Sequence, residues 1–91
     1  AFFHKKNQIT YATKKNNKTF VVDRTLEEIQ NQLSSADFYR ANRQFIIQRS
    51  SIEDITFYFN GRLIVNILPK PEEKIIVSKA KATEFKKWLA F

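Results

Sequence analysis

The chain has 91 residues, the size of one small domain with a single modest core. Hydrophobic residues make up 43% of it, so it has enough apolar surface to fold, and a disordered chain is excluded. It contains no cysteine, which excludes disulfides and thiolate metal sites, and no apolar run approaches the roughly 20 residues of a membrane span. The net charge of +7 predicts a polyanionic partner, of which nucleic acid is the commonest.

The amino-terminal part of the chain is predicted to form strands. Its first four residues are an apolar run without an initiating Met or a preceding cap, which indicates a fragment of a longer protein, entered within a strand. Residues 9–13 and 19–22 have the β-branched and aromatic composition of strands. Between them, Asn16 and Asn17 tolerate the positive φ of a tight turn, so these two segments are predicted to form a hairpin.

A first helix is predicted from Leu26 to Leu33. Thr25 and Glu28 have the spacing of a capping box, in which each side chain accepts a hydrogen bond from the other residue's backbone N–H. Leu26, Ile29 and Leu33 then fall on one helical face, where they can pack against a sheet.

Four further strands are predicted at residues 45–47, 52–59, 62–68 and 74–77. The pair Asn60-Gly61 is the strongest short-range hairpin signal in the chain, and it joins the second of these strands to the third. Ser78 is placed to cap a second helix, whose inner face carries Ala82, Phe85, Trp88 and Leu89. The predicted fold class is therefore mostly β, a compact strand-rich domain with two short helices.

The segment from Phe38 to Gln48, with the sequence FYRANRQFIIQ, is the most informative part of the chain. Arg40 and Arg43 lie three residues apart beside an apolar strand. This arrangement predicts a rigid element that directs cations outward, toward the expected polyanion.

The order of the segments resembles the LytTR family, the DNA-binding output domain of many bacterial response regulators. The matching blocks, in order over nearly the whole chain, are TLEEI (25–29), FYRANRQFII (38–47), Ile52, YFNGRL (58–63), VSK (77–79) and FKKWL (85–89). The chain departs from the family in two respects. Gln48 stands where the family usually has Asn, and the opening strand or strands of the family are missing, which can leave a sheet edge uncovered.

The resemblance implies a compact domain, residues 1–91, that reads double-stranded DNA through loops and strand ends rather than through a recognition helix. It also implies a receiver domain upstream in a two-component response regulator, whose phosphorylation favours dimers on paired half-sites. The isolated domain is expected to be a monomer, to need no cofactor and to work in the cytoplasm.

The family contacts DNA from three places, which match residues 4–8, 42–44 and 78–81 here. Arg can donate two hydrogen bonds to guanine, Asn or Gln can pair with adenine, and Lys binds phosphate. Asn7, Arg43, and Ser78 or Lys79 are the strongest single candidates. The full set of predicted DNA-contacting residues is Lys6, Asn7, Gln8, Arg40, Asn42, Arg43, Gln44, Ser78, Lys79 and Lys81.

Several of these residues have a second interpretation. Arg40 is as well suited to an internal salt bridge with Asp37 or Glu53 as to DNA. With one His and no Cys, His4 is better explained as a solvated or capping residue than as a metal ligand. The lysines at positions 14, 15 and 18 form either a solvated hairpin tip or contacts with flanking phosphates.

Catalysis is the weakest class of function for this chain. It has no Ser-His-Asp arrangement, and a single Gly excludes a Gly-rich phosphate loop. The alternative to duplex DNA binding is a protein-interaction or single-stranded RNA module, which is also small, basic and rich in strands. The aromatic residues are typical of a core rather than of a stacking platform for bases.

Overall fold

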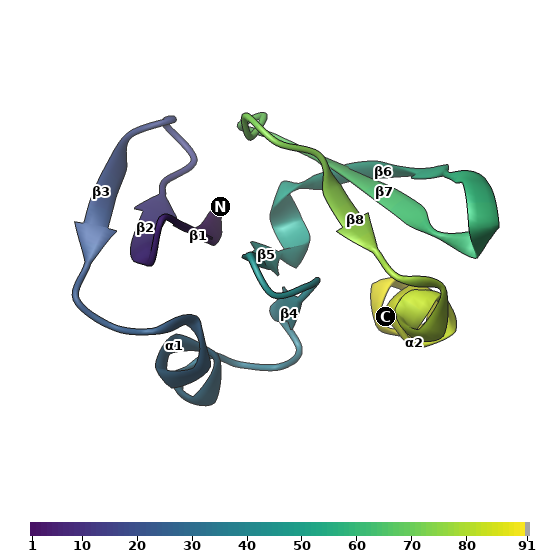
Figure 1. Ribbon diagram of the computed structural model, residues 1–91, viewed down its shortest axis with the longest axis horizontal. Coiled ribbons are helices and arrows are strands. Elements are labelled where there is room, and N and C mark those ends of the chain that lie inside the picture. Colours follow the sequence, from purple (N-terminus) through teal and green to yellow (C-terminus); the bar gives the residue numbers. More distant parts are fainter. Residues whose placement is uncertain (91) are drawn as a thin grey trace.

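The computed structural model describes residues 1–90, in which eight strands form two antiparallel sheets and two helices pack beside them (Figure 1). The first sheet has the strand order β3-β2-β1-β5-β4, and the second has the order β6-β7-β8. The bounds of the elements are β1 (Phe2–Lys6), β2 (Ile9–Thr13), β3 (Thr19–Val22), α1 (Leu26–Gln32), β4 (Phe38–Arg40), β5 (Phe45–Gln48), β6 (Ile52–Phe57), β7 (Leu63–Ile67), β8 (Ile75–Val77) and α2 (Lys79–Leu89). The predicted fold class, mostly β with two short helices, is confirmed.

Strand β1 lies at the centre of the first sheet. Phe2 pairs with Thr13 of β2 on one side and with Ile47 of β5 on the other. The edge strands of this sheet are therefore β3 and β4 rather than the first strand of the chain.

The predicted hairpin between β2 and β3 is present. Its turn closes through a hydrogen bond from the backbone N–H of Lys14 to the carbonyl of Lys18, 2.9 Å long. Asn17 takes the positive φ, at 68°, and Asn16 Oδ1 accepts a hydrogen bond of 3.0 Å from the backbone N–H of Lys18. The Asn pair thus works as the sequence predicted, because Asn pays little steric penalty in the left-handed region.

Helix α1 begins with the predicted capping box. The backbone N–H of Glu28 donates to Thr25 Oγ1 over 3.1 Å, and the backbone N–H of Thr25 donates to Glu28 Oε1 over 3.0 Å. Leu26 and Ile29 are buried against Ile46 of β5, so the helix covers one face of the first sheet. Its amphipathic spacing is therefore the reason it packs there.

Strand β4 was not predicted from the sequence. Its three residues, from Phe38 to Arg40, pair with residues 46–48 of β5 in antiparallel register. Three residues are too few for an alternating pattern to stand out, so only the pairing with β5 identifies the segment as a strand.

Strands β6 and β7 form the predicted hairpin, but both are shorter than expected. The last pair of the ladder is Phe57 with Leu63, and the five residues between them form the turn. Asn60 and Gly61 take positive φ, at 61° and 74°, inside the 3₁₀ turn η2 (Phe59–Gly61). The Asn-Gly pair therefore predicted the position of the turn correctly. The turn is longer than a two-residue hairpin turn, so the two strands end earlier than predicted.

The main core lies where α2 packs on β8 and faces both sheets. Phe85 of α2 is fully buried, as are Ile75 and Val77 of β8 and Ile47 of β5. Trp88 is partly buried beside Phe85, so the predicted inner face of α2 is confirmed. Over residues 1–90, no helix is long and apolar enough to cross a membrane.

Candidate nucleic-acid interface

The loop between β4 and β5 is shaped by the side chain of Asn42. Its Oδ1 accepts hydrogen bonds from the backbone N–H groups of Gln44, at 2.8 Å, and Phe45, at 3.0 Å. Its Nδ2 donates to the carbonyl of Ile76 in β8 over 2.9 Å, which ties the loop to the second sheet. Arg43, the residue between these anchored positions, is exposed. The turn therefore projects Arg43 outward from a rigid base.

Arg40 uses its guanidinium within the domain. Its Nε donates to the carbonyl of Asn42 over 2.7 Å, and its Nη2 donates to the carbonyl of Arg43 over 2.9 Å. Both acceptors are backbone carbonyls of the β4–β5 loop, so Arg40 supports the loop from the end of β4. Arg40 also lies close to the exposed Arg43, and both line the same surface groove.

The acidic partner of Arg40 is Glu27 of α1, rather than Asp37 or Glu53 as considered from the sequence. Arg40 Nη2 lies 3.3 Å from Glu27 Oε1, because α1 crosses the sheet beside β4. The Glu27 carboxylate accepts hydrogen bonds from its own backbone N–H and from Arg40, and these lower its pKa, the backbone bond more strongly. The Arg40 side chain is only 16% exposed, so most of it is enclosed by the loop and the helix.

Predicted contact residues of the β4–β5 loop and of α2 line one open groove with a volume of about 620 Å³. The residues that line this basic groove are Gln30, Arg40, Ala41, Asn42, Arg43, Arg62, Ile76, Ser78 and Lys81. Four of them are cationic and none is acidic. A concave surface with one sign of charge concentrates the field that attracts a polyanion.

The start of α2 forms one wall of the basic groove. Ser78 occupies the N-cap position, but its hydroxyl makes no capping hydrogen bond, so the predicted side-chain cap is wrong. Lys79 and Lys81 lie in the first helical turn, which contains no acidic residue. Free backbone N–H groups and the positive end of the helix dipole favour an anion here.

The turn between β1 and β2 consists of Asn7 and Gln8 alone. Both residues have positive φ, at 51° and 65°, and they join the pair Lys6 and Ile9 as a two-residue turn with both central residues in the left-handed region. The sequence had placed a loop over residues 4–8, but residues 4–6 belong to β1. Asn7 and Gln8 are exposed and do not line the basic groove.

Lys6 and Gln44 lie outside the basic groove and face an acidic loop. Lys6 Nζ is 3.4 Å from Glu72 Oε2, and Gln44 Nε2 is 3.5 Å from Glu73 Oε2. The backbone N–H of Lys5 donates to the carbonyl of Gln44 over 2.9 Å, so the end of β1 adjoins the β4–β5 loop. These exposed side-chain contacts contribute little stability and leave both residues accessible.

His4 is part of an aromatic stack rather than a solvated or capping residue. Its ring lies 5.0 Å from that of Tyr11 and 6.0 Å from that of Phe45, close to parallel with both. Burial among these rings lowers the pKa of His4, and the nearby Glu72 opposes this in part. His4 lies two residues after Phe2 in β1, so both side chains are on the same face of the sheet. This face packs toward the second sheet.

Arg62 is the one cation of the basic groove that the sequence did not identify. It follows the Asn-Gly turn, a position that indicates a solvated hairpin and carries no sign of a site. Residues 68–74 separate β7 from β8, and the sequence alone does not show how those strands align across this connection. Only the register of the folded sheet brings Arg62 beside the start of α2.

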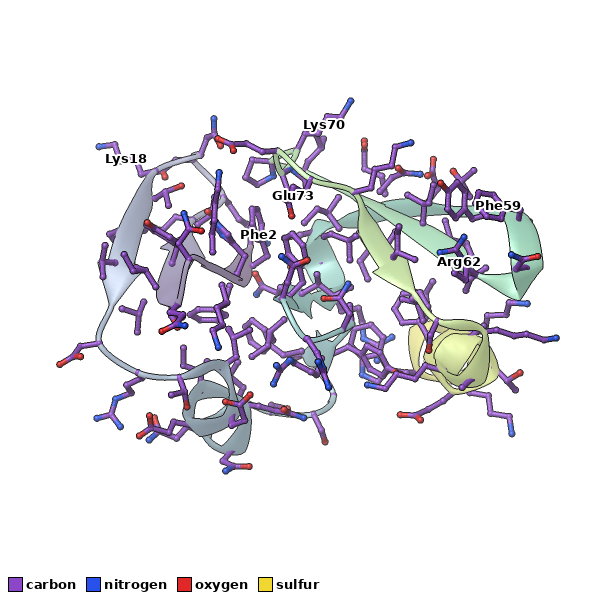
Figure 2. All side chains as sticks on the ribbon, viewed as in Figure 1. Phe2, Lys18, Phe59, Arg62, Lys70 and Glu73 are labelled. Carbon is purple, nitrogen blue, oxygen red and sulfur yellow. The ribbon has the colours of Figure 1, made fainter. Side chains whose placement is uncertain are left out.

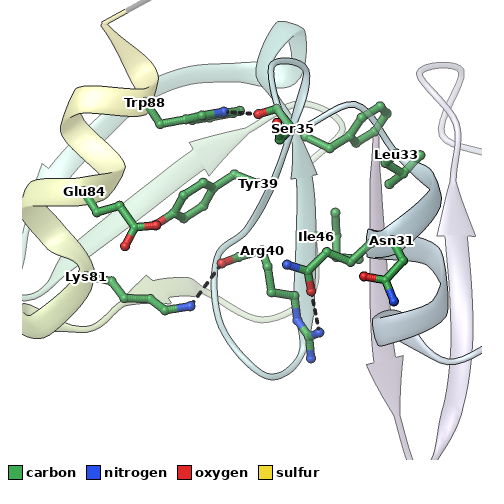
Figure 3. Close-up of a pocket in the computed structure, with 11 residues that line it drawn as sticks. Asn31, Leu33, Ser35, Tyr39, Arg40, Ile46, Lys81, Glu84 and Trp88 are labelled. Carbon is green, nitrogen blue, oxygen red and sulfur yellow. Dashed lines mark hydrogen bonds between the residues drawn. The ribbon is translucent and has the colours of Figure 1, made fainter.

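A second cavity, about 590 Å³ in volume, lies between α1, β4 and α2 (Figure 3). Across it, Trp88 Nε1 donates to the carbonyl of Ser35 over 2.7 Å, and Lys81 Nζ lies 3.5 Å from the carbonyl of Arg40. These contacts hold α2 at a set position against β4. They therefore fix the first turn of α2 relative to the β4–β5 loop.

Tyr39 closes the wall of the same cavity. Its hydroxyl donates to Glu84 Oε1 of α2 over 3.2 Å, and its ring packs 5.2 Å from that of Phe85. Burial, with the negative charge of Glu84, raises the pKa of Tyr39 to about 12. Tyr39 thus remains a neutral hydrogen-bond donor over the ordinary pH range.

The fold and the basic groove together define a small strand-rich domain suited to binding a polyanion along a loop and a helix start. The family of LytTr DNA-binding domains matches residues 1–90, and the chain belongs to this family. The resemblance to this family is therefore confirmed, and DNA is the expected partner.

The chain is 35% identical over 71 residues to the sensory transduction protein LytT of Bacillus subtilis (strain 168). That match covers 78% of this chain and 29% of LytT, so the chain spans less than a third of this relative. It also resembles, with a TM-score of 0.83 and 24% identity, the solved LytTr DNA-binding domain of a protein described as a methyl-accepting/DNA response regulator from Bacillus cereus. The likeness covers 99% of this chain and 80% of the other, and it shows the shared fold.

Proposed function

We propose that this domain binds double-stranded DNA sequence-specifically and controls transcription as the output domain of a two-component response regulator. The observation that carries the proposal is the basic groove, where four cations and no carboxylate meet between the β4–β5 loop and α2. Membership of a DNA-binding family supports DNA as the polyanion. A duplex offers phosphates for the cations and base edges for the exposed side chains.

Arg43 is the proposed base-reading residue of the groove. It is exposed, while Arg40 at the end of β4 and Asn42 in the loop use their polar groups to hold the backbone around it. A guanidinium on a rigid turn can donate two parallel hydrogen bonds to guanine O6 and N7. Arg40 and Asn42 then contribute by positioning Arg43.

The start of α2 is the proposed phosphate site of the same groove. Ser78 offers a hydroxyl that no capping bond occupies, and Lys79 and Lys81 add charge beside the free N–H groups of the helix. The positive end of the helix favours a phosphate at this position. These contacts place the domain on the duplex without reading its sequence.

The β1–β2 turn is proposed as a second reading element, separate from the groove. Asn7 and Gln8 are exposed at its tip, and an amide side chain can pair with adenine N6 and N7. Lys6 and Gln44 lie between this turn and the groove and are proposed to contact the intervening backbone. Figure 1 shows the hairpin, the β4–β5 region and α2 spread along the longest axis of the molecule.

The test compares Arg43→Ala with Lys15→Ala, which removes the same charge from the tip of the β2–β3 hairpin. Duplexes selected by the wild-type domain from a random pool are titrated in fluorescence anisotropy, beside scrambled duplexes. Arg43→Ala is expected to lose roughly 1–3 kcal/mol on the selected duplex and little on the scrambled one. Lys15→Ala should weaken both slightly and equally. If Arg43→Ala lost the same affinity on both duplexes, Arg43 would contact only phosphate and would not read a base.

The longer protein is proposed to contain a receiver domain before this one and to act in the cytoplasm. The names of the two relatives, a sensory transduction protein and a response regulator, support this context. Phosphorylation of the receiver would pair two output domains on two half-sites. The domain by itself is proposed to be a monomer, because its groove accommodates one half-site.

The competing function, binding of single-stranded RNA or of a protein, is tested in the same titration. Single-stranded RNA added in excess should displace little of the selected duplex. Displacement at equal concentrations would favour the RNA module instead.

A further inference from the structure

Arg62 lies in a row of three residues that crosses the second sheet beside the basic groove. The register pairs Phe57 with Leu63 across β6 and β7, and Leu63 with Val77 across β7 and β8. One position further along, Tyr58, Arg62 and Ser78 are neighbours and point to the same face of the sheet. Arg62 thus adjoins Ser78, which forms the start of the proposed phosphate site.

The Arg62 guanidinium is held in place by two aromatic rings. Its Cζ lies 4.9 Å from the ring centre of Tyr58 and 4.4 Å from that of Phe59, and its Nε donates to the carbonyl of Phe59 over 3.4 Å. Figure 2 shows Arg62 and Phe59 at the same end of the β6–β7 hairpin, near α2. Such stacking restricts the rotamers of the side chain before any ligand arrives.

No carboxylate of residues 1–90 lies within salt-bridge distance of Arg62. The two ion pairs in this part of the chain join Lys6 to Glu72 and Arg40 to Glu27. A stacked guanidinium keeps its remaining N–H groups free to donate to an anion. Arg62 is therefore an oriented cation whose charge is not matched within the domain.

Gly61 brings the hairpin tip against the first turn of α2. A Cβ on Gly61 would lie 2.9 Å from Cγ of Lys79, and the φ of Gly61 is +74°. Glycine adopts this φ without steric cost, and its lack of a side chain lets the Lys79 side chain pack against the tip. The tip therefore contacts the first turn of α2, beside Arg62.

We propose that the tip of the β6–β7 hairpin is a further DNA-contacting element, in which Arg62 binds a backbone phosphate of the duplex that occupies the basic groove. This inference rests on the proposed DNA binding, and it assigns a separate phosphate contact to Arg62. Tyr58 and Phe59 are positioning residues that orient the guanidinium. The phosphate bound by Arg62 adjoins the one held at the start of α2.

The test measures the affinity of Arg62 variants for the selected duplex and for a scrambled duplex over a range of salt concentrations. Arg62→Ala is expected to bind both duplexes about tenfold more weakly and to lower the slope of log Kd against log salt by about 1. Lys87→Ala is the matched control, since it removes one charge from the last turn of α2, outside the groove. It should change affinity by less than about twofold.

Arg62→Lys keeps the charge but loses the planar stacking, so it should recover only part of the affinity. Thermal melts show whether each variant is folded, and Arg62→Gln replaces Arg62→Ala if the alanine variant is unfolded. The inference is overturned if a folded, neutral Arg62 variant matches Lys87→Ala in affinity and salt slope while the wild-type domain binds its duplex. Failure of the wild-type domain to bind any duplex would instead refute the proposed function.

Discussion

Asn42→Ala tests how the β4–β5 loop is held. The substitution removes three hydrogen bonds, two accepted from the backbone of Gln44 and Phe45 and one donated to the carbonyl of Ile76. Alanine leaves these three backbone groups without their partners. Two of the bonds shape the loop, and the third joins it to the second sheet, so both functions are lost together.

The expected loss is worked from these three bonds. Each contributes about 1 kcal/mol net, and a backbone group that water cannot reach costs about 1–3 kcal/mol when it is left unpaired. Because the loop is partly exposed, water replaces some of the bonds, and a total of about 2–4 kcal/mol is expected for Asn42→Ala. In a domain of this size that loss lowers the melting temperature by about 10–20 °C.

Urea and thermal unfolding, followed by the fluorescence of the single Trp88, measure the loss. Gln44→Ala is the matched control, since its side chain makes one exposed contact of 3.5 Å and should cost less than about 0.5 kcal/mol. Asn42→Asp keeps the acceptor and should be intermediate. The reasoning is refuted if Asn42→Ala melts together with Gln44→Ala. A stable Asn42→Ala variant that binds DNA normally would also show that the loop needs no such support.

Three further outcomes are expected. Trp88→Ala should lose about 3 kcal/mol, since the ring packs on Tyr39 and Phe85 and its N–H bonds to the carbonyl of Ser35; an unchanged melting temperature would contradict this packing. Because the folded pKa of Tyr39, about 12, exceeds its ordinary value of 10.0, its contribution to stability is complete below pH 10.0 and is lost as the pH rises toward about 12. Tyr39→Phe should flatten that decline in alkaline urea unfolding, and an equally steep decline would refute the assignment. The domain should sediment as a monomer, and fusion to a dimeric partner should raise its affinity for tandem half-sites by about 100-fold; a stable dimer of the domain alone, or equal affinity for single and tandem sites after fusion, would contradict both expectations.

Local chemistry made several parts of this domain predictable from sequence. Thr25 and Glu28 cap α1 because the partners of a capping box lie three residues apart, and no distant contact is needed. Asn17 and the Asn60-Gly61 pair mark their turns because a positive φ is a property of single residues. The exposure of Arg43 followed from the apolar run that begins two residues after it, at Phe45.

The parts that were missed depend on contacts between distant segments. Strand β4 exists because β5 supplies its partners, and Arg40 bonds to Glu27 because α1 folds across the sheet. Asn42 was predicted to contact DNA, but its side chain ties the loop to the second sheet, because β8 brings the carbonyl of Ile76 within reach. Glu27 is 13 residues from Arg40, and Ile76 is 34 residues from Asn42, so neither partner can be inferred from neighbouring residues.

The sequence by itself determined the family, the mostly β fold class, the turns and the cationic character of the surface, because periodicity, turn chemistry and charge are carried by neighbouring residues. Only the tertiary structure decided which cations share one groove. Arg62 joins Arg43 and Lys81 there because the register of β7 with β8 places it beside Ser78. Register is set by packing and hydrogen bonding across the whole sheet, and a one-residue slip would direct Arg62 to the opposite face.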